Sequence, residues 1–285
     1  VGAIPIFIDV KRDTFNIDPT KLSDTLKTAK DMGINVKGIM PVGLFGQPAE
    51  MDLINDFAKN NNLWVLDDAA QSFGGKHKDK IVGNLSEVAA TSFFPAKPLG
   101  CYGDGGAVFT NDREIYEIAN SSHIHGMGKK RYEYDRIGMN ARMSTIQAAI
   151  LLEKLEIFPE ELKKRQVVAE NYNKNLNSLN LEIKLPKINK NLKSSWAQYT
   201  ILLPENINRD KLQEYLKSKN IPTAVYYPIP LNEHRPYNKY PVSKSGLDVT
   251  YYLSKNVLSL PMHPYLKEDV IINISDNIND FIKNY

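Results

Sequence analysis

The stretch Trp64-Val-Leu-Asp-Asp-Ala-Ala-Gln71 decides how the chain is interpreted, because a short apolar run leads directly into two acids. In parallel α/β sheets, ligands bind beyond the carboxyl ends of the strands. If the run is a buried strand, Asp68 stands where a binding site would be. An aspartate after a strand also commonly caps the helix that follows. The residues alone leave both roles open for Asp68.

A second stretch, residues 91–106, repeats this pattern. It reads Thr-Ser-Phe-Phe-Pro-Ala-Lys-Pro-Leu-Gly-Cys-Tyr-Gly-Asp-Gly-Gly, so a predicted strand ends at polar residues, here Ser92 and Lys97. Lys97 stands among apolar residues and glycines, where burial would lower the pKa of its amine and free it as a nucleophile. The glycines allow the backbone to approach a ligand closely. Most lysines are surface residues, but few stand between Phe-Phe-Pro and Leu-Gly.

Around these two stretches, short apolar runs alternate with helical patterns through the first half of the chain. Asp18 and Pro19 predict the start of a helix, with Asp18 as N-cap and Pro19 in the first helical position. The alternation predicts a mostly parallel sheet covered by helices, which is an α/β fold. The predicted strands are 4–10, 36–42, 63–66, 88–93 and 106–110, and the predicted helices are 18–30, 51–60 and 112–120.

The middle of the chain combines a long loop with helices. Residues 121–142 are rich in glycine, tyrosine and charged side chains, and irregular loops of this length tend to be functional. Ser144 is expected to cap a helix with apolar residues at helical spacing. Pro159 is expected to start a second helix, because proline is tolerated in the first turn of a helix and disrupts its interior.

Beyond about residue 180 the pattern changes to a smaller α+β arrangement. The predicted strands there are 196–203, 224–227 and 257–260, and the predicted helices are 209–219 and the residues after 268. We therefore expect two domains: a large domain over residues 1–178, which carries the site, and a small C-terminal domain over residues 179–285.

The composition argues against several classes of function. The chain has 285 residues and a net charge of +3, and its tightest basic cluster is residues 129–131, so no nucleic-acid partner is expected. No run of about 18 apolar residues occurs, so no membrane span is expected. The five histidines lack metal-like spacing, so no metal site is expected. The one cysteine, Cys101, is expected to pack rather than react, and a chain without internal disulfides fits the cytoplasm.

The two stretches together resemble the DegT/DnrJ/EryC1/StrS family of sugar aminotransferases, which depend on pyridoxal phosphate (PLP). The resemblance covers the chain from Ile4 onward. It is closest to the branch that aminates C3 of UDP-linked 2-acetamido-3-keto sugars, including uronic acids. The motifs that carry it are Asp68-Ala-Ala-Gln71, Ser92-Phe-Phe-Pro-Ala-Lys97, Gly103-Asp-Gly-Gly106, Asn140-Ala-Arg-Met143, Gln147-Ala-Ala149, Trp196-Ala-Gln-Tyr199, Ile221-Pro-Thr223 and Leu260-Pro-Met-His-Pro264.

The resemblance implies a role for five residues at the cofactor. Lys97 is expected to bind PLP covalently and to move a proton between substrate and cofactor. Asp68 is expected to pair with the protonated pyridine nitrogen, which keeps the ring an electron sink. Gln71 is expected to lie against the ring or its phenolic oxygen, and Ser92 to bind the phosphate. Asn140 is expected to reach the phosphate in a neighbouring subunit.

The resemblance also implies the fold, the substrates and the assembly. It implies a large domain of the aspartate-aminotransferase-like type and a homodimer with shared active sites. The amino group would pass from L-glutamate to a nucleotide-linked keto sugar, in the biosynthesis of amino sugars or cell-surface polysaccharides. Arg142 is expected to contact substrate, as are Tyr226 and Tyr227, which stand where this branch often has His-Tyr. For Asn140 and Arg142 the alternative is a pair that stabilises the loop.

Two further points bear on function. The family has a segment before the strand at Ile4, with a Gly-Thr turn that helps to hold the phosphate, so we expect a partial phosphate site in this sequence. A PLP sugar dehydratase of the same fold is the rival enzyme, but its family typically replaces the anchoring lysine with histidine, unlike Lys97. A non-catalytic sugar-sensing or interaction protein that retains the fold is the alternative from another class.

Overall fold

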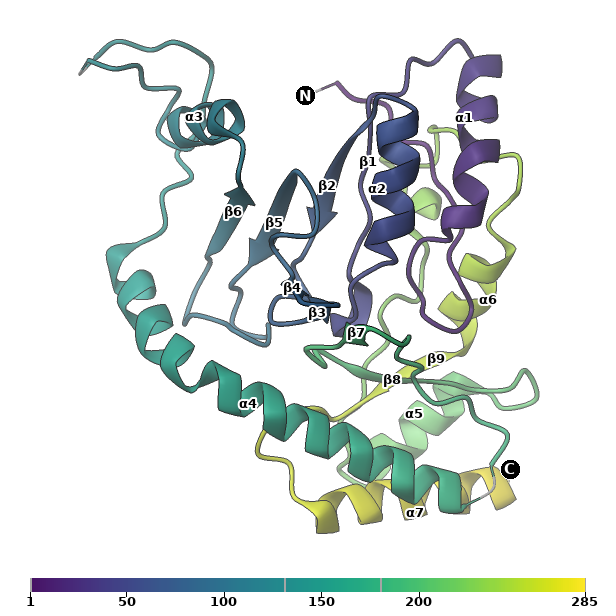
Figure 1. The fold of residues 1–285 in the computed structure, drawn as a ribbon. Coiled ribbons are helices and arrows are strands. Elements are labelled where there is room, and N and C mark those ends of the chain that lie inside the picture. Colours follow the sequence, from purple (N-terminus) through teal and green to yellow (C-terminus); the bar gives the residue numbers. More distant parts are fainter. Residues whose placement is uncertain (1, 131, 180, 285) are drawn as a thin grey trace.

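A four-stranded sheet forms the centre of the first half of the chain (Figure 1). The computed structural model describes residues 2–130, 132–179 and 181–284. The strand order is β1-β2-β5-β6, and only the last pair is antiparallel, so the predicted mostly parallel sheet is confirmed. The strands are β1 (Gly38–Ile39), β2 (Trp64–Asp68), β5 (Val88–Ser92) and β6 (Gly106–Thr110).

Three short helices accompany this sheet, close to their predicted positions. They are α1 (Leu22–Asp31), α2 (Met51–Asn60) and α3 (Arg113–Ser122). Asp18 caps the short 3-10 helix η1 (Pro19–Lys21) that leads into α1, and Asp112 caps α3 through a bond from the Ile115 N–H. Helix α2 buries Met51, Ile54 and Ala58 in the core under the sheet, and this apolar stripe explains why it was predictable.

Helix α4 (Thr145–Ser178) corrects the prediction of a helix break, because Pro159 lies inside one continuous helix. Ser144 is its N-cap residue, although its side chain makes no capping bond. The first half of the helix buries Leu151 and Phe158 against the segment around Leu99, and the second half buries residues in the C-terminal core. Packing of both halves outweighs the helix bond that a proline forfeits.

The C-terminal part is built on a two-stranded antiparallel sheet and three helices. Its core also takes in the second half of α4, which runs beneath the sheets, with α7 alongside it (Figure 1). Helix α6 was not predicted, and the predicted strand 196–203 forms only from Tyr199. These elements are β8 (Tyr199–Leu202), β9 (Val257–Leu260), α5 (Arg209–Ser218), α6 (Asp248–Asn256) and α7 (Glu268–Asn284).

Two predicted strands, residues 4–10 and 224–227, are wrong. The first makes only isolated bridges, from Phe7 and Val10, and the second makes one between Ala224 and Ser259. Hydrogen bonds of a side chain hold residues 4–10 in place instead. Asp9 is 0% exposed and accepts bonds from the N–H groups of Val249 and Thr250 at the start of α6. A segment held by such bonds needs no partner strand.

A further small sheet and two single turns were not predicted. The sheet has the order β4-β3-β7 and joins the segment after β2 to residues before Trp196. Two-residue strands carry too little pattern to be found from sequence. These elements are β3 (Lys76–His77), β4 (Lys80–Ile81), β7 (Leu192–Lys193), and the 3-10 turns η2 (Leu44–Gly46) and η3 (Leu231–Glu233).

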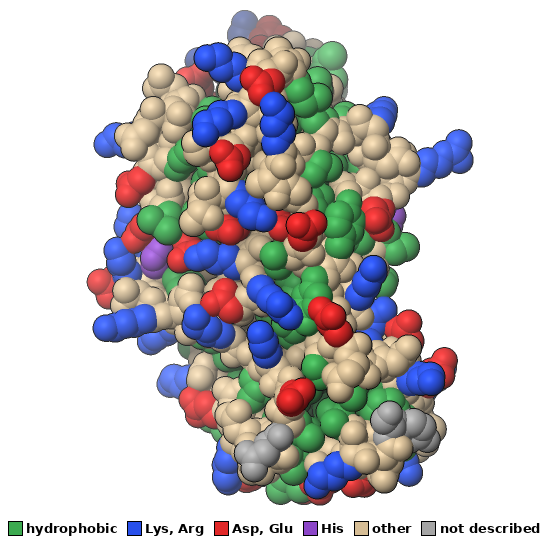
Figure 2. All heavy atoms as spheres, turned by 90° about the vertical axis from the view of Figure 1, so that its right-hand side faces the viewer, with side chains coloured by type: hydrophobic (Ala, Val, Ile, Leu, Met, Phe, Trp, Pro, Cys, Tyr) green, Lys and Arg blue, Asp and Glu red, His purple; other side chains and the backbone are tan. Residues whose placement is uncertain are grey.

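The surface carries charges of both signs. Figure 2 shows lysine and arginine side chains interspersed with aspartate and glutamate over the face that bears α1. Several of these cations are paired, for example Lys11 with Glu50 and Lys244 with Asp31. Within the described ranges, no helix combines the length and the apolar character that crossing a bilayer requires.

Candidate active site

The carboxyl ends of β2 and β5 meet at one edge of the central sheet. The two strands are parallel, and Asp68 at the end of β2 stands in register with Ala90, two residues before Ser92. Lys97 follows β5 in a tight turn in which its N–H donates to the carbonyl of Phe94 (2.9 Å). The fold therefore brings both polar strand ends of the sequence to the same place, as parallel strands require.

Asp68 and Lys97 interact electrostatically across this edge. Burial lowers the pKa of the Lys97 amine, and the Asp68 carboxylate opposes that shift because it favours the ammonium. One Asp68 oxygen, Oδ1, also accepts a bond from the N–H of Ala70 (3.0 Å). Asp68 therefore stabilises the local turn, and it does so while its charge still acts on Lys97.

Helix α4 holds the loop that carries Lys97. Gln147 accepts a bond from the Tyr102 N–H through Oε1 (2.8 Å), and the Lys154 ammonium donates to the carbonyl of Gly100. Cys101 is fully buried within this loop and directs its thiol to the carbonyl of Phe93 (2.9 Å), which fits its predicted packing role. Sequence reasoning missed the bonds of Gln147 and Lys154, because their partners lie about 45 and 54 residues away.

Gln71 and Tyr227 come together from distant parts of the chain. Gln71 is only 6% exposed, and its Nε2 donates to the Tyr227 hydroxyl (3.3 Å). Burial raises the pKa of Tyr227, and the neighbouring Tyr226 and the Asp68 carboxylate raise it further. Tyr227 therefore shares its surroundings with Asp68. Tyr226 turns instead toward the apolar cluster around Phe45.

The other three predicted residues, Ser92, Asn140 and Arg142, make local hydrogen bonds. Ser92 is half-buried, and its Oγ accepts a bond from the Phe94 N–H (3.2 Å) in the turn before Lys97. Asn140 and Arg142 are exposed, and Arg142 Nε donates to Asn140 Oδ1 (3.1 Å). Within one chain this pair stabilises the loop that precedes α4.

An exposed apolar surface surrounds that loop. Ile137 is 98% exposed, and Ile146, in the first turn of α4, is 70% exposed. Single exposed apolar residues are ordinary, but several on one loop and the helix that follows it favour an interface. We refer to it as the loop–α4 surface, and it comprises Ile137, Met139, Met143, Ile146, Leu152 and Leu155.

Asp67 is a second acid of the strand, and sequence reasoning assigned it no role. It is 0% exposed, and neither of its carboxylate oxygens has a hydrogen-bond partner among the described residues. Burial raises the pKa of Asp67 to about 7, with a smaller contribution from the charge of Asp68. Because successive side chains of a strand point to opposite faces, Asp67 faces the core while Asp68 faces the site.

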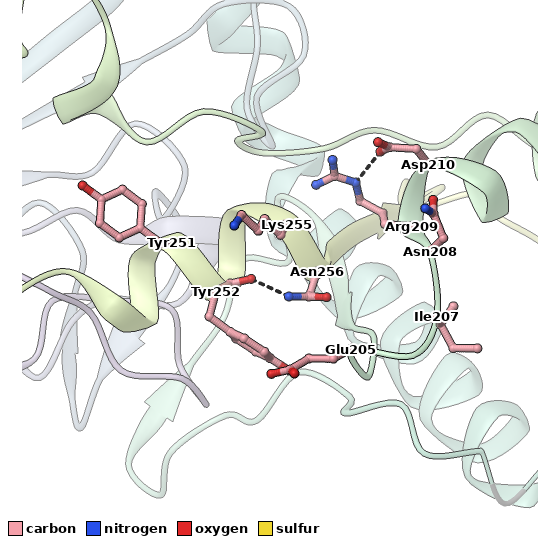
Figure 3. A pocket seen from close by; sticks show the side chains of 9 residues that line it. All are labelled: Glu205, Ile207, Asn208, Arg209, Asp210, Tyr251, Tyr252, Lys255 and Asn256. Atoms are coloured by element: carbon pink, nitrogen blue, oxygen red, sulfur yellow. Dashed lines mark hydrogen bonds and ion pairs between the residues drawn. The ribbon is translucent and has the colours of Figure 1, made fainter.

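A cavity of about 520 Å³ lies elsewhere, between α5 and α6 (Figure 3). Its buried cation is already engaged, since Arg209 bonds Asp210 and the carbonyl of Ser254. None of the predicted site residues lines it. Its lining residues are Glu205, Ile207, Asn208, Arg209, Asp210, Tyr251, Tyr252, Lys255 and Asn256.

The residues at the strand ends fit PLP. The cofactor requires an amine that can bind its aldehyde carbon and an anion for its protonated pyridine nitrogen. Lys97, with its lowered pKa, supplies the amine, and Asp68 supplies the carboxylate within electrostatic range of it. Gln71 and Tyr227 add polar groups beside this pair. The donor set is therefore the one that this cofactor needs.

Comparison with known proteins agrees with this chemistry. The sequence model of the DegT/DnrJ/EryC1/StrS aminotransferase family matches residues 1–279. A UDP-2-acetamido-2-deoxy-3-oxo-D-glucuronate aminotransferase of Pseudomonas aeruginosa is 46% identical over 93% of this chain and 70% of the relative. The crystal structure of a DegT DnrJ EryC1 StrS aminotransferase from Brucella abortus is 43% identical, with a TM-score of 0.94 over 99% of this chain and 74% of that one. The structure of NtdA from Bacillus subtilis with its cofactor PMP is 26% identical in sequence. Its TM-score is 0.82, and the match covers 97% of this chain and 62% of that one.

Proposed function

The chain belongs to the DegT/DnrJ/EryC1/StrS aminotransferase family, which depends on PLP, and on this premise we propose that it aminates a keto carbon of a UDP-linked sugar. L-Glutamate is the proposed amino donor, and C3 of a 2-acetamido-3-keto sugar, including a uronic acid, is the proposed acceptor. The name of the Pseudomonas aeruginosa relative, at 46% identity, supports this acceptor.

The observation that carries the proposal is the placement of Asp68 and Lys97 at the adjacent carboxyl ends of β2 and β5, where the two charges interact. PLP, when bound, supplies an aldehyde for the amino group and a ring that delocalises the electron pair released at the reacting carbon. Lys97 would hold that aldehyde, and its Nζ, once the incoming amino group has released it, would take and return the proton of the reacting carbon. The Asp68 carboxylate would hold the proton on the pyridine nitrogen. The lowered pKa of Lys97 favours its neutral, reactive form.

The remaining residues of the site bind and orient. Ser92, in the turn before Lys97, is the proposed ligand of the cofactor phosphate. Gln71 is the proposed neighbour of the ring. Tyr227 is fixed by its bond from Gln71, so its aromatic ring is the proposed wall against which substrate lies, with Tyr226 behind it.

The active enzyme is proposed to be a homodimer in the cytoplasm. The exposed loop–α4 surface supplies an apolar face of the kind that obligate interfaces bury. Asn140 stands beside this surface and is proposed to reach the cofactor phosphate of the neighbouring subunit, while Arg142 contacts that subunit's substrate. A shared site of this kind would give a function to the exposed pair that Asn140 and Arg142 form in one chain.

Turnover tests the proposal directly. The protein is incubated with PLP, L-glutamate and a UDP-linked 2-acetamido-3-keto sugar, and 2-oxoglutarate is measured. We expect 2-oxoglutarate and the amino sugar to form in equal amounts. When the keto sugar is omitted, 2-oxoglutarate should not exceed one equivalent per site. A 4-keto sugar serves as the matched control and should react more slowly.

Three outcomes would contradict the proposal. Faster amination of the 4-keto sugar would refute the proposed position of amination. Absence of any 2-oxoglutarate with a panel of nucleotide-linked keto sugars would favour a non-catalytic sugar-sensing role. Elimination of a hydroxyl group from the sugar without amination would instead favour the dehydratase.

A further inference from the structure

The turn Gly43–Gln47, which follows β1, depends on outside groups for its shape. Its own backbone bonds are long, 3.4 Å from Gly46 N to Gly43 O and 3.3 Å from Gln47 N to Leu44 O. Phe45 adopts a φ of 60°, a left-handed conformation that is unfavourable for a bulky side chain. A turn with weak internal bonds and a strained residue needs external support to persist.

Asn16 provides that support on both sides of Phe45. Its Oδ1 accepts a bond from the Leu44 N–H (2.9 Å), and its Nδ2 donates to the carbonyl of Gln47 (2.8 Å). Asn16 is only 4% exposed, so water cannot readily replace these bonds. Loss of the side chain would leave the two backbone groups without partners, at a cost in stability.

This turn, once supported, fixes the orientation of the Gln71 carboxamide. The Phe45 N–H donates to Gln71 Oε1 (2.8 Å), a buried bond that requires the oxygen of the amide to face the turn. With Oε1 on that side, the amide nitrogen must face away, and there it donates to Tyr227 (3.3 Å). A flipped amide would set two donors against each other at Phe45.

We propose that Asn16 is a positioning residue for the active site, which holds the turn Gly43–Gln47 so that Phe45 orients Gln71 toward Tyr227. This inference rests on the proposed function, in which Gln71 borders the cofactor and Tyr227 borders the substrate. Asn16 touches neither of them. Asn16 itself makes two bonds to the turn. Phe45, in the middle of that turn, makes the bond to Gln71.

Gln47 offers a matched control. It is 5% exposed, and its amide also makes one donor bond and one acceptor bond, to the carbonyl of Lys187 and from the N–H of Asn189. Both bonds lead away from Gln71, toward the segment before β7. Asn16→Ala and Gln47→Ala therefore each remove two side-chain hydrogen bonds, and only the first removes support from both sides of Phe45.

The experiment is a double-mutant cycle in kcat/KM between Asn16→Ala and Gln71→Ala. We expect Asn16→Ala to lower kcat/KM about tenfold, and to change it less than about twofold when Gln71 is already alanine, because the two changes act on one contact. Gln47→Ala should stay within about twofold of the unchanged protein. Additive losses from Asn16→Ala and Gln71→Ala would overturn the inference.

A second measurement does not depend on turnover. In ¹⁵N-labelled protein, the side-chain NH₂ signal of Gln71 is assigned by its loss in Gln71→Ala. We expect this signal to shift in Asn16→Ala and to stay in place in Gln47→Ala; an unmoved signal in Asn16→Ala contradicts the inference. If Asn16→Ala does not fold, Asn16→Asp replaces it in both measurements, since it keeps the acceptor for Leu44 and loses the donor to Gln47.

The two hypotheses fail in different ways. If Gln71→Ala leaves kcat/KM unchanged, or if the unchanged protein does not turn over, the proposed function is at fault. If Gln71→Ala lowers kcat/KM and Asn16→Ala does so independently, the proposed function stands and the positioning role of Asn16 is rejected.

Discussion

The carboxylate of Asp68, the last residue of β2, acts on the amine of Lys97, which follows β5. Burial lowers the pKa of Lys97, and Asp68 limits that shift without a direct bond to the lysine. The arrangement leaves the amine reactive and keeps a negative charge nearby. A PLP ring needs both groups, at its aldehyde and at its pyridine nitrogen.

Asp68→Asn should lower kcat by a factor on the order of 10²–10³, the scale of loss when one preorganised electrostatic group is removed. In the cofactor-free protein, the same change should lower the pKa of Lys97 further, because the carboxylate that favours the ammonium is gone. The rate of amine modification at Lys97 as a function of pH measures this shift. A higher pKa of Lys97 in Asp68→Asn would contradict the described geometry.

Asp67 should make the protein less stable as the pH rises. Its pKa is raised to about 7 in the folded protein, above the ordinary value of 3.8, so the folded state binds more protons between these values. The free energy of unfolding should therefore fall as the pH rises from about 4 to about 7, by a few kcal/mol at most. Urea unfolding across this range measures the effect.

Asp67→Asn should remove that component of the pH dependence and stabilise the protein above about pH 7, because no buried charge has to form. Asp56→Asn, at an exposed position of α2, is the control and should leave the profile unchanged. An Asp67→Asn profile parallel to that of the unchanged protein would argue against a buried, neutral carboxyl.

Asp9→Ala should destabilise the protein by about 3 kcal/mol, the scale expected when one partner of a buried, bonded ion pair is lost. Burial alone would raise the pKa of Asp9, but Lys21 and Thr250 outweigh it, so the pKa is lowered. Its stabilising effect is therefore present above the ordinary pKa of 3.8 and is lost as the pH falls below it. Chemical unfolding at neutral pH measures the loss. Asp24→Ala, in an exposed pair with Lys27, is the control and should have little effect.

Mixed dimers should reveal the shared site. Lys97→Ala and Asn140→Ala are each expected to be nearly inactive, but after unfolding and refolding together they should regain about one quarter of the normal activity, because half of the dimers contain one intact site. A mixture of Lys97→Ala and Asp68→Asn is the control and should regain none, since both residues belong to the same chain's site. Equal recovery in both mixtures would refute a site shared through Asn140.

The helices and strands with the clearest sequence patterns were predicted most accurately. Helix α2, β6 and β9 have the bounds that were predicted, because an apolar stripe defines the helix and a short, mostly apolar run defines each strand. The prediction failed where tertiary packing decides. Pro159 stays inside α4 because both halves of that helix are buried against separate cores, which the local sequence cannot reveal. The domain boundary at residue 178 stays a prediction.

The site was predictable in part. The ends of β2 and β5 were found from the pattern of apolar residues followed by Asp68 and Lys97, since adjacent parallel strands bring their ends together. The bond from Gln71 to Tyr227 spans 156 residues, and no local signal announces it. Asn16 likewise acts over 28 residues or more. Contacts of this kind depend on the completed fold.

The most direct test of the account is the visible absorbance of the protein with PLP, compared with that of Lys97→Ala. We expect a band above 400 nm that shifts when L-glutamate is added, and we expect Lys97→Ala to lose both the band and its response. Lys163→Ala, in an exposed ion pair with Glu160 on helix α4, should keep them. A band that persists unchanged in Lys97→Ala would show that another group holds the cofactor, and the central claim would then be wrong.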